Sequence, residues 1–122
     1  MNIAENRQIA EIHHYVGGTV RRAGTDRFAD VFNPATGEVA ARVAMGSADD
    51  VAAAVAAAKA AAPAWAEMPP LRRARILFKF KELLDRHHDD LAALITREHG
   101  KVFSDAKGEV TRGIEVVEFA CG

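Results

Sequence analysis

The sequence predicts a mixed α/β fold in which two β-hairpins come first and about four α-helices follow. Two glycine-containing turns separate short β-favouring runs before residue 44, and beyond residue 47 apolar residues recur at helical spacing. Alternation bounded by turn residues indicates strands, whereas apolar residues three or four apart indicate helices. Residues 1–11 are polar and unpatterned, and we expect them to form a loose terminus.

Turn chemistry predicts both hairpins. Gly17 and Gly18 lie between two β-favouring runs and tolerate the positive φ angles that a two-residue hairpin turn requires. Residues 28–32 form the next strand signal, and the Asn-Pro-Ala-Thr-Gly turn at 33–37 leads to a partner strand at 38–43.

The first helix is expected to begin after Ser47. Ser47 is a favoured N-cap, and Asp50 stands three residues later, where an acidic side chain can complete a capping box. The alanine run 52–62 has the highest helix propensity available. We expect Pro63 to close this helix or to begin its last bend.

Apolar residues that recur every three to four positions predict three more helices. Pro70 suits the first turn of the second helix, His87-His88 marks a corner, and Gly100 ends the third helix. The fourth carries a regular apolar seam at spacings of three to four residues: Val102, Ala106, Val110, Ile114, Val117 and Cys121. Gly108 and Gly113 interrupt it, and such glycines indicate the approach of another backbone or a ligand.

Composition excludes several classes of protein. With 16 basic and 17 acidic residues the net charge is −1, and no basic stripe indicates nucleic-acid binding. The cluster at Arg72, Arg73 and Arg75 is typical of a solvated helix face. Neither a signal-peptide core nor a membrane span is visible, so we expect a cytoplasmic protein.

The histidines, the glycines and the single cysteine show no pattern that predicts a catalytic, metal or nucleotide site in this segment. The five histidines lack the spacing of metal ligands, and no glycine cluster matches a dinucleotide or phosphate-binding loop. Cys121 is the single thiol, which fits a reducing compartment. Its place on the apolar seam favours a small buried core residue over a nucleophile.

Arg112 is the one candidate binding residue, with two interpretations. Its planar, permanently charged guanidinium stands beside Gly113, whose missing side chain leaves room for bidentate capture of a carboxylate. Alternatively, Arg112 forms an ordinary ion pair three residues away with Glu109 or Glu115. Spacing alone favours the ion pair.

Several motifs in this order resemble the aldehyde dehydrogenase superfamily. They are Phe-Asn-Pro-Ala-Thr-Gly-Glu-Val at 32–39, Trp65 followed by Arg72-Arg73, and Leu-Ile-Thr-Arg-Glu-His-Gly-Lys at 94–101. The string AKGEVTRGIEVVEFA at 106–120 is more specific, and resembles the CoA-acylating methylmalonate-semialdehyde (malonate-semialdehyde) dehydrogenases. The match runs from about residue 12 to the end.

The resemblance implies a Rossmann-type cofactor domain and an NAD-dependent reaction. In that family a cysteine thiolate attacks the semialdehyde and hydride passes to NAD. The acyl intermediate then loses CO2, and coenzyme A accepts propionyl or acetyl. The arginine of the Gly-Glu-Val-x-Arg-Gly motif, here Arg112, is implicated in holding the substrate carboxylate.

The same resemblance places the reacting parts elsewhere. Family members are roughly four times longer, so residues 12–122 correspond to an incomplete cofactor-binding domain. The nucleophile and the cofactor-binding residues are expected downstream, and Cys121 does not occupy the nucleophile's motif. We therefore expect this piece alone to be inactive, covered by the remainder of its own chain, and part of a homo-oligomer, a tetramer by analogy.

A second hypothesis is a stand-alone helical interaction module derived from the same family. The second and fourth helices carry wide apolar surfaces, which so small a chain does not readily bury by itself. A stable, discrete oligomer without NAD or CoA binding would favour this module. Neither hypothesis fixes a preference between methylmalonate and malonate semialdehyde.

Overall fold

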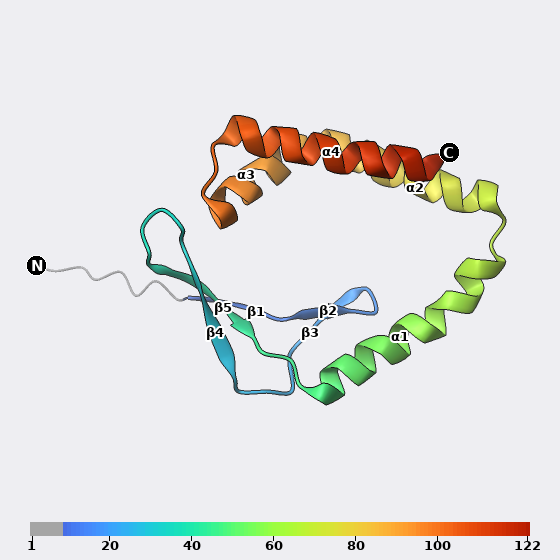
Figure 1. Cartoon of the computed structure of the whole chain (residues 1–122). Coiled ribbons are helices and arrows are strands. Elements are labelled where there is room, and N and C mark those ends of the chain that lie inside the picture. The colour runs from blue at the N-terminus through green and yellow to red at the C-terminus, as the bar shows by residue number, and fades with distance from the viewer. Residues whose placement is uncertain (1–8) are drawn as a thin grey trace, which may run out of the picture. The chain divides into compact units, whose positions relative to one another are not determined.

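The structure is a computed structural model that describes residues 9–122. The chain divides into two compact units between residues 61 and 62, within the first helix, and each unit is described by itself. The elements, labelled in Figure 1, are β1 (Ala10–Ile12), β2 (His14–Val16), β3 (Thr19–Arg21), β4 (Phe28–Phe32), β5 (Val39–Ala44), α1 (Ala48–Glu67), α2 (Pro70–Arg86), α3 (His88–His99) and α4 (Phe103–Cys121).

Both predicted hairpins form in the first unit. β2 and β3 make a two-stranded antiparallel sheet, with Gly17 at φ 63° and Gly18 at φ 81° in its turn. β4 and β5 pair antiparallel around a turn in which Gly37 adopts φ 73° and its N–H donates to the carbonyl of Asn33. These are the left-handed positions that glycine adopts without strain.

An additional strand corrects the expected loose terminus at residues 1–11. Residues 1–8 lie outside the described part of the chain, but Ala10–Ile12 forms β1 and pairs parallel with β5. The three-stranded sheet therefore has the order β1-β5-β4. Sequence patterning missed β1 because three residues are too few to show alternation, and the strand forms by pairing with a distant edge.

Helix α1 begins with the predicted capping box. The Asp50 carboxylate accepts from both the backbone N–H and the hydroxyl of Ser47 at 2.8 Å, and the Asp50 N–H donates to the Ser47 hydroxyl at 3.1 Å. Pro63 does not end the helix, which continues to Glu67. Proline's φ is compatible with a helix, and Pro63 removes one backbone hydrogen bond from an alanine-rich segment of high helix propensity.

In the second unit, α4 packs against both α2 and α3 (Figure 1). Helix α2 starts at Pro70, His87 separates it from α3, and Gly100 ends α3 at φ 84°, all as predicted. Ala92 and Ala106 are fully buried between α3 and α4, where small side chains allow close approach. The same buried cluster includes Val110 and Ile114, with Leu84, Leu91 and Ile95 packed against it.

Candidate functional site

Arg112 projects from the exposed side of α4. Val110 and Ile114, two residues before and after it, are buried, and a two-residue step on a helix reaches the far side of the cylinder. The predicted ion pair with Glu109 or Glu115 is not formed, and no other ion pair involves Arg112 among residues 9–122. A Cβ added at the neighbouring Gly113 would meet nothing within 4 Å. Within residues 9–122 the Arg112 guanidinium therefore has no carboxylate partner in direct contact.

Glu109 pairs with Lys101 instead. Lys101 lies in the connection between α3 and α4, and its Nζ donates to Glu109 Oε1 on α4. This hydrogen bond is the main cause that holds the pKa of Glu109 below its ordinary value, with smaller contributions from the charges of His99 and Arg112. Arg112 thus lies close enough to influence the Glu109 carboxylate but does not bind it.

A second polar cluster joins the start of α3 to the middle of α4. The Thr111 hydroxyl donates to the carbonyl of Lys107 at 3.0 Å, and its oxygen lies 3.1 Å from His88 Nε2. Lys107 Nζ lies 2.7 Å from Asp89 Oδ1, and this contact is the main cause of the lowered pKa of Asp89. These contacts connect the start of α3 to the part of α4 that precedes Arg112.

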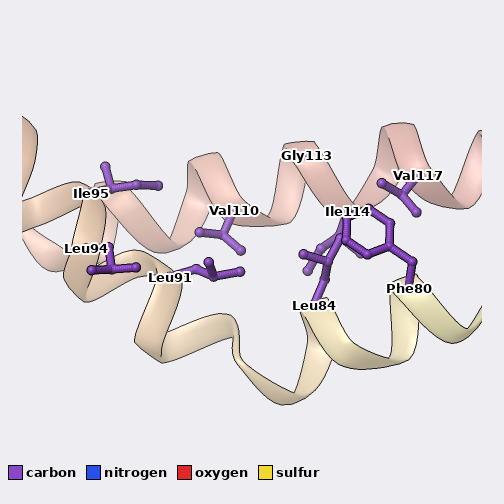
Figure 2. Close-up of a pocket in the computed structure, with 9 residues that line it drawn as sticks. All are labelled: Phe80, Leu84, Leu91, Leu94, Ile95, Val110, Gly113, Ile114 and Val117. Atoms are coloured by element: carbon purple, nitrogen blue, oxygen red, sulfur yellow. The ribbon is translucent and has the colours of Figure 1, made fainter. Parts of the chain in front are cut away.

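An apolar groove of about 400 Å³ opens between α4 on one side and α2 and α3 on the other (Figure 2). Its lining is almost entirely hydrocarbon: Phe80, Leu84, Leu91, Leu94, Ile95, Val110, Gly113, Ile114 and Val117. Arg112 does not line it, although the adjacent Gly113 does. The groove presents no polar group that could take part in chemistry, so it is suited to packing.

The predictions for Gly108 and Cys121 have different outcomes. Gly108 lies on the exposed face of α4, and a Cβ added at Gly108 or Gly113 would have no atom within 4 Å apart from the adjoining residues and the backbone of α4 itself. The expected close approach is therefore absent within residues 9–122. Cys121 is buried at 7% exposure and ends the α4 seam, as predicted for a core residue. The seam holds from Ala106 onward, whereas Val102 precedes the helix and is 63% exposed.

None of the described glycines at positive φ lies in a strand-to-helix turn, and Gly46, which does join β5 to α1, is a single glycine and not part of a glycine-rich loop. Gly17 and Gly18 form a hairpin turn and Gly100 a helix C-cap, so none of them joins a strand to a helix N-terminus as a pyrophosphate-binding loop does. No group of three or more metal-ligating side chains gathers in residues 9–122. Over the same residues, every helix is too short or too polar to cross a membrane.

Comparison with known proteins identifies the family. The model of the aldehyde dehydrogenase family matches residues 20–122. The chain belongs to the aldehyde dehydrogenase family. It is 48% identical over 114 residues to malonate-semialdehyde dehydrogenase 2 of Oceanobacillus iheyensis, covering 93% of this chain and 24% of that protein. It is 46% identical over 110 residues to the malonate-semialdehyde dehydrogenase of Pseudomonas aeruginosa, covering 90% and 22%.

Solved structures of aldehyde dehydrogenases have the same fold. A Sinorhizobium meliloti 1021 protein, described as a methylmalonate-semialdehyde dehydrogenase and complexed with NAD, matches with a TM-score of 0.91 and 46% identity. The match covers 95% of this chain and 24% of that one. The predicted α/β class and the family resemblance are confirmed, and the chain spans about a quarter of the length of these relatives.

Proposed function

We propose that residues 12–122 are the N-terminal part of the cofactor-binding domain of an NAD-dependent, CoA-acylating malonate- or methylmalonate-semialdehyde dehydrogenase. Within it, Arg112 binds the carboxylate of the semialdehyde. The complete protein would convert the semialdehyde to acetyl-CoA or propionyl-CoA with release of CO2, as a homo-oligomer.

The observation that carries this proposal is the state of Arg112. Its guanidinium is exposed, forms no ion pair within residues 9–122, and stands beside a glycine that leaves open space. A guanidinium presents two parallel N–H donors that match the two oxygens of a carboxylate. Relatives 46–48% identical to this chain are malonate-semialdehyde dehydrogenases, whose substrate carries such a carboxylate.

We expect the residues that bind NAD and coenzyme A to lie elsewhere in the complete enzyme, so we assign no step of the reaction to residues 9–122. NAD accepts hydride and coenzyme A accepts the acyl group when each is bound. What this part of the chain contributes is orientation: an arginine on a packed helix holds one end of the substrate, so that the aldehyde end is presented to residues elsewhere in the enzyme.

The test uses the enzyme made from the complete reading frame. Arg112→Lys keeps the positive charge but loses the fork that binds both carboxylate oxygens. Loss of one charge-assisted hydrogen bond of about 1.5 kcal/mol predicts a roughly tenfold higher KM for malonate semialdehyde. The KM for propanal, which has no carboxylate, should not change. Equal losses with both substrates would show that Arg112 is structural.

A further inference from the structure

Three charged side chains lie in series at the N-terminal half of α4. Gly100 ends α3 in the left-handed conformation, and the chain then turns through Lys101 and Val102 into α4. This turn carries the Lys101 ammonium back over the second turn of α4, where it meets the Glu109 carboxylate. Arg112 follows Glu109 by three residues, which places the two side chains next to each other on the helix surface.

The Lys101–Glu109 pair is more covered than the Lys79–Glu82 pair on α2, and it is covered to about the same degree as the Lys81–Asp85 pair. The Lys101 side chain is 21% exposed, compared with 60% for Lys79 in its pair with Glu82 on α2. Partial burial strengthens the attraction between two charges and reduces screening by salt. The Glu109 carboxylate is therefore bound to Lys101 and not to Arg112.

Without Lys101, Glu109 would be the natural partner for Arg112. Two acids stand three residues from Arg112, namely Glu109 before it and Glu115 after it. An acid that precedes its cation along a helix pairs better than one that follows, because this order suits the helix dipole. Glu109 would therefore compete more strongly than Glu115 with the substrate carboxylate for Arg112, and Glu109 is the acid that Lys101 binds.

The geometry points to Lys101 as a positioning residue that takes up the Glu109 carboxylate and so leaves Arg112 for the carboxylate of the substrate. This inference rests on the proposed role of Arg112. It adds a specificity determinant that touches neither the substrate nor the reacting atoms. The lowered pKa of Glu109 agrees with it, because Glu109 stays ionised and bound to Lys101 at neutral pH.

The experiment compares KM values for malonate semialdehyde and propanal in the enzyme from the complete reading frame. Lys101→Met removes the ammonium and keeps the length of the side chain. We expect KM for malonate semialdehyde to rise about three- to fivefold, with kcat and the KM for propanal unchanged. The matched control is Lys79→Met, which breaks the exposed Lys79–Glu82 pair and should leave both KM values at wild-type level.

The double variant Lys101→Met/Glu109→Gln decides the mechanism. Because Gln cannot form an ion pair with Arg112, the double variant should recover the wild-type KM for malonate semialdehyde. A double variant as impaired as Lys101→Met would overturn the inference, since Lys101 would then bind substrate directly or act structurally. An equal effect of Lys101→Met on both substrates would overturn it as well. Failure of the Arg112→Lys test would instead refute the proposed function, so the two failures are distinguishable.

Discussion

Single side chains on α4 show how the partner of each charge determines what the helix surface can bind. Arg112 and Glu109 have the spacing of an ordinary helical ion pair, and the sequence alone favoured that pair. The structure gives Glu109 a different partner, because Lys101 reaches it from outside the helix. One residue in the preceding turn therefore changes Arg112 from a paired surface charge into an available one.

The capping box of α1 makes a prediction at this scale. Hydrogen bonds from the backbone N–H and then the hydroxyl of Ser47 lower the pKa of Asp50 from its ordinary value of 3.8. Since the folded-state pKa is depressed, Asp50 stabilises the fold above pH 3.8, and that contribution is lost as the pH falls through the folded-state pKa.

Asp50→Asn should therefore lower the melting temperature at neutral pH, and the difference from wild type should shrink progressively as the pH falls below 3.8. Thermal unfolding followed by circular dichroism across this range measures it. Asp49→Asn, which removes a neighbouring acid that forms no ion pair within residues 9–122, is the matched control. A difference that persists unchanged at acid pH would contradict the assigned role of the Asp50 carboxylate.

Sequence reasoning predicted the capping contact at the start of α1, but it favoured a local ion pair of Arg112 that is not formed, and it missed the distant contacts. Ser47 and Asp50 are three residues apart, so helical geometry alone brings them together. His88 and Thr111 are 23 residues apart, and their contact depends on how α3 folds against α4. The Lys101–Glu109 contact is intermediate between these two. Gly100 predicts a turn after α3, but the sequence does not predict which carboxylate of α4 lies close to that turn.

At the level of whole elements, the glycines of the α3–α4 pair have opposite roles. Gly100 adopts φ 84° at the end of α3, where a side chain is strained. Gly108 lies in the interior of α4, where an added Cβ would have open space. Its only effect there is to lower the helix propensity of α4.

We expect Gly100→Ala to lower the free energy of unfolding by about 1 kcal/mol and Gly108→Ala to raise it by about 0.5–1 kcal/mol. Urea denaturation of this chain followed by circular dichroism measures both. A destabilising Gly108→Ala would mean that another part of the chain approaches this face of α4, as the sequence first suggested.

Element types were predictable, whereas some boundaries were not. Turn and cap residues such as Gly17, Gly100 and Pro70 act on their own neighbours, so hairpins and helix ends followed from the sequence. Strand β1 depends on pairing with β5 about thirty residues away, and the length of α1 depends on alanines outweighing Pro63.

For the whole molecule, the apolar surface exceeds what residues 9–122 cover. The groove between α2, α3 and α4 is hydrocarbon-lined, and Phe119 on α4 is 87% exposed. Relatives are about four times longer than this chain, so a complete enzyme has further segments with which such surfaces can pack. A self-associating helical module would use the same surfaces, so apolar area alone does not separate the two hypotheses.

Activity of the complete reading frame separates them most directly. We predict that its purified product sustains NADH formation from malonate semialdehyde over many turnovers only when NAD and coenzyme A are both supplied, with acetyl-CoA and CO2 as products. Residues 1–122 purified alone should form none. A reading frame that closes after Gly122, or NADH formation by the 122-residue chain by itself, would contradict the account.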